Sequence, residues 1–189
     1  MRIHSLLTFL SRRSPGLVLS LSLACGAPST VRPPPASLSA SASCAVWERE
    51  MSFARSVRDH DELAFAEHVH PGAVFGDADG VLRGRQAIVS GWQPIVQGKN
   101  IHLEWYPTSV VPTGDPHVVL SRGPYLMENT APTAAARFVT GVFQSVWVSD
   151  VDGRWRVLID GGTPPPVPAT EIVVDAFRRA TPVSCPSAP

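Results

Sequence analysis

The sequence predicts one α+β domain in which helices come first and an antiparallel sheet follows. Between residues 45 and 95, hydrophobic residues recur at spacings of three and four, which is the period of an amphipathic helix. From residue 101 onward the spacing changes to two, the period of strands with one buried face. Of the 189 residues, 44% are hydrophobic and 17% are charged, so the chain can form a packed core. A run of helices followed by a run of strands is typical of α+β folds.

Three helices are predicted before residue 100, with a short hairpin between the second and the third. The first helix covers residues 45–58 and the second covers residues 62–69. Residues 73–75 and 81–82 are expected to form short strands around a turn that is rich in glycine and aspartate. The third helix opens at Gly84 and contains a proline that should kink it.

Four strands are predicted after residue 100, and the alternation of their side chains defines them. They cover residues 101–106, 118–127, 137–149 and 155–160. The last two should form a hairpin, because Gly153 can supply the positive φ of a bulged turn. Three consecutive prolines after residue 163 are expected to end the sheet.

The N-terminal 43 residues have the composition of an export signal followed by a spacer. A basic stretch, a short apolar run and a small residue precede Cys25, as in secretory signals. The spacer is rich in Pro, Ser and Ala and should be disordered. The predicted organisation is a signal peptide at 1–24, a linker at 25–43, a folded domain at 44–163 and a tail at 164–189 that is helical at 170–179.

The residues around Cys25 resemble a bacterial lipobox, in which the cysteine carries lipid and becomes the mature N-terminus. Two alternatives stay open, namely a cleaved, soluble secreted protein and an uncleaved anchor. The lipobox interpretation predicts a membrane-anchored lipoprotein, and the cleaved alternative predicts a periplasmic or secreted protein. Contact with the membrane is then expected only through the N-terminal lipid.

The charge balance narrows the class of binding partner, and the cysteine content predicts a disulfide. Basic and acidic side chains are equal in number at 16. Residues 1–24 contain three arginines and no acid, so their removal would leave 13 basic side chains against 16 acidic ones. Such a balance argues against binding to nucleic acid. In an oxidising compartment, Cys44 and Cys185 should form a disulfide, with two unpaired thiols as the alternative, and closing a loop of this length contributes about 4–5 kcal/mol at most.

The order and spacing of several short segments carry a resemblance to a known family. These segments are residues 73–75, 84–92, 103–107, 114–115, 146–147 and 152–162. In this order they resemble the nuclear-transport-factor-2-like superfamily, in its SnoaL-like and domain-of-unknown-function branches. The resemblance implies a cone-shaped fold, in which a strongly curved sheet wraps against helices around an apolar pocket. It also implies a homodimer formed through the sheet.

Ketosteroid isomerase is the best-understood enzyme of this type, and its catalytic positions can be placed on this chain. The resemblance places the general base at Asp77 and the two donors to the enolate oxygen at Phe53 and Ser145. A phenylalanine has no hydroxyl, and a serine is a weaker donor than a protonated aspartate. Since losing one such donor typically lowers the rate by about 10²–10³, steroid isomerisation by that mechanism is not expected.

The same resemblance predicts which side chains face the pocket. The residues expected there are Trp92, Tyr125, Phe143, Ser145, Trp147, Leu158 and Asp160, together with Asp77. Each has a structural alternative, because Asp77 is also an ordinary turn residue, and Asp160 can serve as an acceptor for backbone amides. Likewise, Tyr125 can pack at an edge and the tryptophans can belong to the core.

The function expected from these observations is an exported domain that binds a small apolar or aromatic molecule without robust catalysis. One alternative is an isomerase-, cyclase- or hydratase-like enzyme with Asp77 or Asp160 as general base. A second is a dimerisation module at the cell envelope with a filled interior. No cofactor motif is present, and His68 with His70 lacks the further ligands that a metal site needs.

Overall fold

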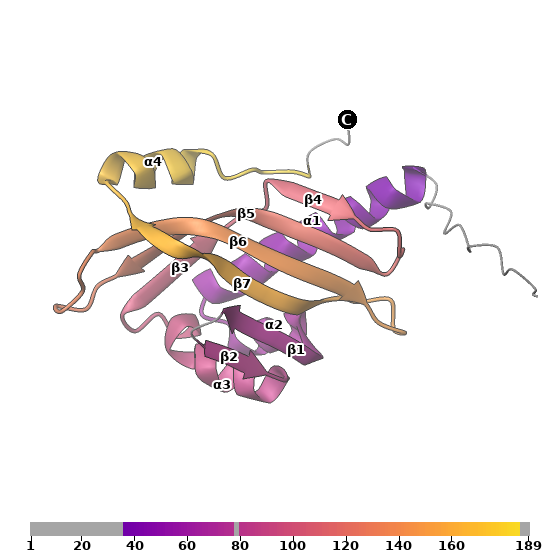
Figure 1. Cartoon of the computed structure of the whole chain (residues 1–189), viewed down its shortest axis with the longest axis horizontal. Helices are drawn as coiled ribbons and strands as arrows, with labels where there is room; N and C mark the ends of the chain where they lie inside the picture. Colours follow the sequence, from indigo (N-terminus) through magenta and orange to yellow (C-terminus); the bar gives the residue numbers. More distant parts are fainter. Residues whose placement is uncertain (1–35, 78–79, 186–189) are drawn as a thin grey trace, which may run out of the picture. The chain divides into compact units, whose positions relative to one another are not determined.

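The computed structural model describes the backbone of residues 36–77 and 80–185, and their side chains except at 36–39, 77, 164 and 165. Helices and strands alternate in the first half and strands dominate the second (Figure 1). The elements are α1 (Ala36–Arg58), α2 (Glu62–His68), β1 (Val69–Asp77), β2 (Gly80–Arg83), α3 (Arg85–Val96), β3 (Ile101–Trp105), β4 (Ser109–Pro112), β5 (Val118–Asn129), β6 (Phe138–Ser149), β7 (Trp155–Pro168) and α4 (Glu171–Arg179).

The strands form one sheet of seven members in the order β2-β1-β7-β6-β5-β3, and β4 pairs with another part of β5. All neighbours are antiparallel except β1 and β7, which are parallel. Helices therefore precede a mostly antiparallel sheet, and the predicted α+β class is confirmed. Within the described part of the chain, no helix combines the length and hydrophobicity that crossing a bilayer requires.

The two faces of the sheet are covered by different helices. On one face, Phe143 and Trp147 pack into the main hydrophobic core together with Phe53 of α1. On the other face, Leu126 and Phe138 form a second cluster with side chains from α4. Alternation along β5 and β6 explains this division, since successive residues of a strand point to opposite sides. The candidate site lies on the α1 side.

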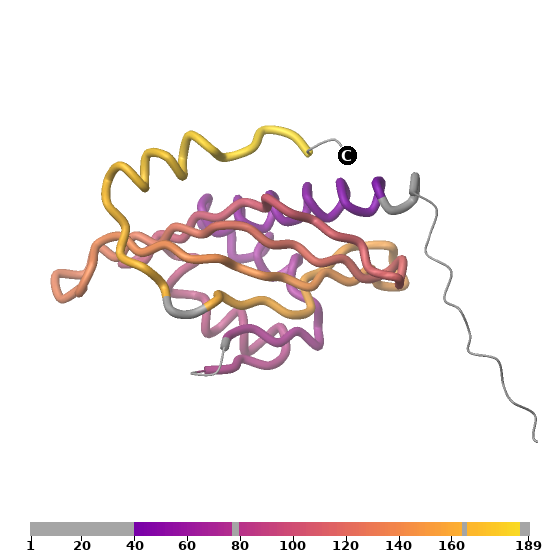
Figure 2. The backbone as a smooth tube through the Cα atoms, turned by 45° about the horizontal axis from the view of Figure 1, so that its top comes forward, coloured from indigo at the N-terminus to yellow at the C-terminus, as the bar shows by residue number. Residues whose placement is uncertain are grey.

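The second cluster fixes the C-terminal helix on the sheet. Val174 and Phe177 of α4 are buried there, and the Phe177 ring lies 4.8 Å from that of Tyr106 between centroids. Arg178 adds an ion pair with Glu104 of β3 at 2.7 Å. From β7 the chain turns into α4 and runs back along the sheet toward the start of α1 (Figure 2).

The structure differs from the sequence prediction at α1, β1 and β4. Helix α1 begins at Ala36, so the last part of the predicted linker is helical. Alanine is the strongest helix former, and extending a helix that is already packed costs little. Strand β4 was not predicted, and β1 is longer than the three residues expected.

Strand β7 also continues through the three prolines that were expected to end the sheet. Its pairing with β1 stops at Asp160, whereas its pairing with β6 continues to Pro168. Beyond Asp160, one side of β7 is therefore an edge. Proline lacks the N–H that a central strand needs, but it is tolerated at an edge. The prediction was wrong because the local sequence does not show on which side the partner lies.

The predicted disulfide is confirmed, since Cys44 of α1 is bonded to Cys185, with 5.5 Å between their Cα atoms. The bond closes a loop with a sequence separation of 141 residues. It connects the chain that follows α4 to the helix that begins the fold. A long closed loop reduces the conformational entropy of the unfolded chain, so the bond stabilises the folded state.

We expect the double variant Cys44→Ser/Cys185→Ser to lose about 2–4 kcal/mol of unfolding free energy. Urea unfolding of both proteins, each with and without a thiol reductant, measures the loss. The reductant should destabilise the wild-type protein to the level of the variant and leave the variant unchanged. Cys25 is present in both proteins, so an effect that acts through it would appear in the variant as well. The prediction is contradicted if the reductant does not change the free energy of unfolding of the wild-type protein.

Candidate functional site

A hollow of about 380 Å³ lies between α3 and the α1-facing side of the sheet. The described residues of its wall are mostly apolar, and one of them is a carboxylic acid. The residues that line it are Ile95, Leu103, Trp105, Tyr125, Met127, Phe143, Asp160, Gly161 and Gly162. They come from α3, β3, β5, β6 and β7, so most of the wall belongs to hydrogen-bonded strands.

The strand register brings the aromatic lining residues together. Trp105 of β3 is opposite Tyr125 of β5, and Phe143 of β6 is opposite Gly162 of β7. The Tyr125 ring occupies space that glycine leaves open, since a Cβ at Gly141 would lie 2.6 Å from the tyrosine hydroxyl. Glycine at this position is therefore required for the observed place of Tyr125.

Asp160 is the acidic group of the wall, and β6 holds its orientation. The Ser145 hydroxyl donates a hydrogen bond of 2.7 Å to Oδ1 of Asp160. Only 9% of Asp160 is exposed. Burial, and then the charge of Glu50, raise the pKa of Asp160 to about 7, while the hydrogen bond from Ser145 lowers it. The carboxyl therefore changes its protonation state near neutral pH.

A second acid, Glu50 of α1, lies fully buried behind the cavity wall. Its Oε1 accepts a hydrogen bond of 2.8 Å from the indole of Trp105, and its Oε2 accepts one of 2.7 Å from the indole of Trp147. Burial raises the pKa of Glu50, and the two indoles oppose this shift, followed by the hydroxyls of Ser121 and Ser145. Trp105 therefore connects Glu50 to the cavity wall.

Glu50 is not among the site residues that the sequence predicts, although its position in α1 carries a signal. Hydrophobic residues of α1 lie on one face, and Glu50 is three residues after Trp47 and three before Phe53 on that same buried face. A charged side chain within such a stripe must find partners on another element. The partners here are 55 and 97 residues away in the sequence, and the local pattern does not reveal them.

The structure brings together only part of the predicted site. Tyr125, Phe143 and Asp160 line the cavity, and Ser145 lies directly behind Asp160. Trp147 is fully buried and donates to Glu50, so it supports the wall from the core.

Two of the predicted lining residues, Trp92 and Leu158, do not line the cavity. The side chain of a third, Asp77, lies outside the described part of the structure. Trp92 of α3 packs against the rings of Phe65 and Phe75, each at 5.5 Å between centroids. Leu158 is not among the residues that line the cavity. For Asp77 the structure describes the backbone, which ends β1 opposite Gly80, but not the side chain.

A bulge in β7 explains the position of Leu158. Ile159 is opposite Val146 and Val157 is opposite Trp147, so Leu158 has no partner on β6. The extra residue reverses the alternation of the strand. Val157 is fully buried in the core and Asp160 faces the cavity, so both lie on the same face of the sheet. In a regular strand, two residues three apart would lie on opposite faces.

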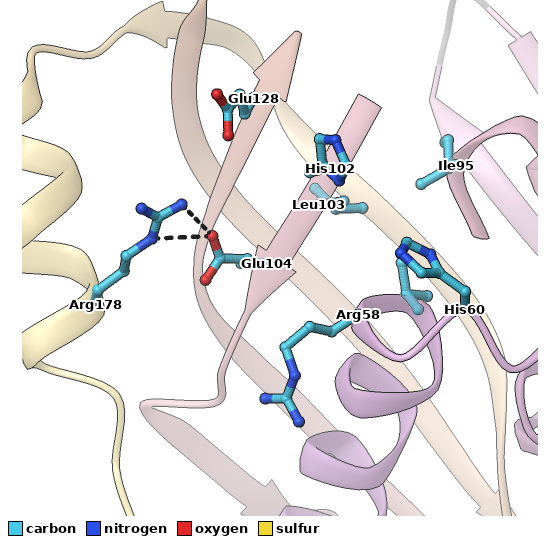
Figure 3. A pocket seen from close by; sticks show the side chains of 9 residues that line it. Arg58, His60, Ile95, His102, Leu103, Glu104, Glu128 and Arg178 are labelled. Carbon is cyan, nitrogen blue, oxygen red and sulfur yellow. Dashed lines mark hydrogen bonds and ion pairs between the residues drawn. The ribbon is translucent and has the colours of Figure 1, made fainter. Parts of the chain in front are cut away.

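A second hollow of about 340 Å³ lies at the free edge of β3, with charged groups around it (Figure 3). Arg178 is paired with Glu104, and Glu128 is paired with Arg137 outside the hollow. Nδ1 of His60 lies 2.8 Å from the carbonyl oxygen of Val96. Its acids already have partners, so this hollow is a weaker candidate for a ligand than the cavity at Asp160.

The described residues contain no group of three or more His, Cys, Asp or Glu side chains that could hold a metal ion. The histidines among them therefore form no metal centre. His68 is buried, and its Nδ1 lies 2.6 Å from the carbonyl oxygen of Ala64. Burial, followed by the charge of Arg49, lowers the pKa of His68 to about 4. His70 pairs instead with Asp150.

No family model and no curated protein matches this sequence. Solved structures do match the fold. An NTF2-like protein of unknown function from Pseudomonas putida KT2440 has a TM-score of 0.55 and 14% identity, over 66% of this chain and 87% of its own. An NTF2-like superfamily protein from Salmonella enterica serovar Typhimurium has a TM-score of 0.54 and 14% identity, over 69% and 93%. A ketosteroid isomerase-like protein from Erwinia carotovora atroseptica has a TM-score of 0.52 and 13% identity, over 65% and 97%. The chain has the fold of the nuclear-transport-factor-2-like superfamily, as its sequence predicted.

Proposed function

We propose that this domain binds a small, largely apolar molecule in the cavity at Asp160. A volume of about 380 Å³ lies within the usual range of ligand sites, which runs from about 300 to 1,000 Å³. The observation that carries the proposal is a buried carboxyl in the wall of an otherwise apolar hollow. Such a wall gives affinity through its hydrocarbon surface and orientation through its polar group.

Obstructing the cavity should abolish binding. Gly162→Phe adds a ring to the lining, and a Cβ at this position meets Tyr125 only at an ordinary contact distance of 3.4 Å. We expect at least tenfold weaker binding of any ligand found by native mass spectrometry or thermal-shift screening of an apolar library. A ligand that is kept out of the cavity loses about 25 cal/mol of binding free energy for each Å² of apolar surface that it would have buried there.

Ile159→Phe is the matched control, because Ile159 is on the same strand but 49% exposed and does not line the cavity. This variant should retain the affinity of the wild-type protein. Equal binding by Gly162→Phe would place the ligand elsewhere. If the screen of a broad apolar library finds no ligand, the proposal loses its main support.

A second candidate is an enzyme in which Asp160 transfers a proton. The observation that favours it is the pKa of about 7, since a general acid or base works best when its pKa is near the operating pH. Steroid isomerisation in particular gains no support, because Phe53 has no hydroxyl and packs among aromatic rings. Turnover that is unaffected by Asp160→Asn and by Asp77→Asn would exclude this candidate.

A dimerisation module without a ligand is the third role that the sequence left open. It requires a filled interior, and a hollow of about 380 Å³ counts against it. A homodimer formed through the sheet is a separate matter and stays a prediction. Sedimentation equilibrium of the folded domain would contradict it by showing a monomer at every concentration.

The proposed location is outside the cytoplasm, with a lipid on Cys25 as the anchor. A disulfide between Cys44 and Cys185 supports an oxidising compartment. Residues around Cys25 lie outside the described part of the chain, so the anchor rests on the sequence alone. Metabolic labelling with a fatty acid tests it, and label that persists in Cys25→Ser would exclude lipidation at this residue.

A further inference from the structure

We propose that the molecule bound in this cavity is an organic cation, a protonated amine on an apolar or aromatic body, whose ammonium group pairs with Asp160. This inference rests on the proposed ligand binding and names the chemical class of the ligand. Three features of the described residues carry it, namely the charge of the wall, the hydrogen bonding of Asp160 and the aromatic side chains around it.

The cavity has acids at and behind its wall and no base among the lining residues that the structure describes. None of the nine described lining residues is an arginine, lysine or histidine. The charged group that acts on Asp160 is Glu50, another acid, which approaches from α1. The other described groups around Asp160 are the Ser145 hydroxyl from β6, Phe75 of β1, which is opposite Asp160, and apolar or aromatic side chains from α3, β3 and β5. A carboxylate in this wall therefore has no counter-ion among the described groups.

The hydrogen bonding of Asp160 leaves room for a ligand. Ser145 is the one described side chain that donates to it, and the bond goes to Oδ1. A buried carboxylate needs several donors or an opposite charge to offset its loss of water. An ammonium group supplies both, since it carries a positive charge and up to three N–H donors. A neutral hydroxyl would supply one donor and no charge.

The aromatic wall suits the same kind of group. Trp105, Tyr125 and Phe143 all line the cavity. The faces of such rings carry partial negative charge and attract cations, by about 0.5–2 kcal/mol per contact. Trp105 donates its indole N–H to Glu50, so it offers the cavity only its ring surface. The rest of the lining is hydrocarbon, thioether or glycine, which suits an apolar body.

Other ligand classes fit less well. An anion would meet Asp160 and Glu50 without any basic side chain among the described lining residues. A metal ion would find one carboxyl where it needs several ligands, and the described residues hold no such cluster. A neutral carbonyl compound is the strongest rival, because a protonated Asp160 can donate to it.

The sign of the pH dependence separates the amine from this rival. An amine needs the ionised form of Asp160, whereas a carbonyl needs the protonated form. With a pKa of about 7, the ionised fraction of Asp160 rises about tenfold between pH 6 and pH 8. Affinity for an amine should therefore rise about tenfold over this range, and affinity for a carbonyl compound should fall about tenfold.

Three probes of matched size make the test, namely 3-phenylpropylamine, 3-phenylpropan-1-ol and 3-phenylpropanal. Binding to the full folded domain is measured by NMR titration at pH 6 and pH 8. At pH 8 the amine should bind at least tenfold more tightly than the alcohol. In Asp160→Asn this preference should fall to within threefold, and the pH dependence of amine binding should disappear.

The possible outcomes separate this inference from the proposed function. If the alcohol or the aldehyde binds and the amine binds no better at pH 8, the ligand class is wrong and the cavity remains a binding site. If the amine preference persists in Asp160→Asn, the ammonium group does not pair with Asp160. If no probe binds at millimolar concentration, or if Gly162→Phe leaves the signal of a bound probe unchanged, the cavity itself is not a site for molecules of this kind.

Discussion

Replacing Asp160 by asparagine is expected to stabilise the folded protein at pH 8 by about 4 kcal/mol. Asparagine has nearly the same shape, and its carbonyl oxygen can still accept the hydrogen bond from Ser145. The replacement removes a charge that burial and Glu50 both disfavour. The pKa of Asp160 rises from 3.8 to about 7 on folding, and each pKa unit corresponds to about 1.4 kcal/mol.

The gain should depend on pH in a defined direction. Below pH 3.8 Asp160 is protonated in both the folded and the unfolded chain, so the variant and the wild-type protein should be equally stable. Between pH 3.8 and 7 the unfolded chain ionises first, and the free energy of unfolding of the wild-type protein falls relative to the variant. Above pH 7 the difference stays constant.

His68 has the opposite pH dependence and serves as an internal reference. Its pKa falls from 6.5 to about 4 on folding, so both proteins lose stability as the pH falls through this interval. Because His68 is unchanged in the variant, the difference between the two proteins isolates Asp160. Urea unfolding at pH 4, 6 and 8 measures that difference. A gain that is independent of pH, or a less stable variant at pH 8, contradicts the assignment.

A side chain whose position reduces the stability of the folded protein gives information about function. Functional sites commonly hold groups in environments that shift their pKa and reduce the stability of the fold. Asp160 is such a group, and it lies in the wall of the cavity rather than at a surface ion pair. The same unfavourable charge is what a cationic ligand would neutralise. The stability measurement and the ligand measurement therefore examine one property of the site in two ways.

The elements that depend on local pattern could be predicted from the sequence. Hydrophobic spacing gave the helices and the long strands, and the two cysteines at the ends of the folded region gave the disulfide. The family resemblance predicted Tyr125, Phe143 and Asp160 in one pocket, and in the structure all three line the cavity; their role in binding stays a prediction. These features follow from periodicity, chain order and a known arrangement of strands.

What could not be predicted depends on contacts between distant segments. The bulge at Leu158 changes which side chains face the helices, but nothing in the run from Trp155 to Asp160 marks it. The prolines at the end of β7 are compatible with a strand only because β1 stops earlier. Glu50 is an unusual residue for a buried helical stripe, yet its role depends on two indoles contributed by β3 and β6.

Replacing Glu50 by leucine is expected to lower the free energy of unfolding by about 2–6 kcal/mol. The change leaves the indole N–H groups of Trp105 and Trp147 buried without an acceptor, and each such group costs about 1–3 kcal/mol. Glu50→Gln is the matched control, since the two indoles donate to different oxygens of Glu50 and the glutamine NH2 group, which cannot accept, replaces one of these oxygens. It should lose about half as much. Urea unfolding gives both values, and hydrogen exchange of the indole N–H groups shows which bond persists.

The opposite result is physically reasonable and would change the interpretation of the site. A buried carboxylate loses its hydration, and replacing buried charges by well-packed apolar groups can stabilise a protein. If Glu50→Leu were as stable as the wild-type protein, burial of the acid would outweigh its two hydrogen bonds. Both variants remove the charge that raises the pKa of Asp160, so that pKa should fall in both, as ¹³C NMR of its carboxyl can show. A pKa of Asp160 that stays near 7 in both variants would mean that burial alone sets it and that Glu50 only supports the wall through Trp105.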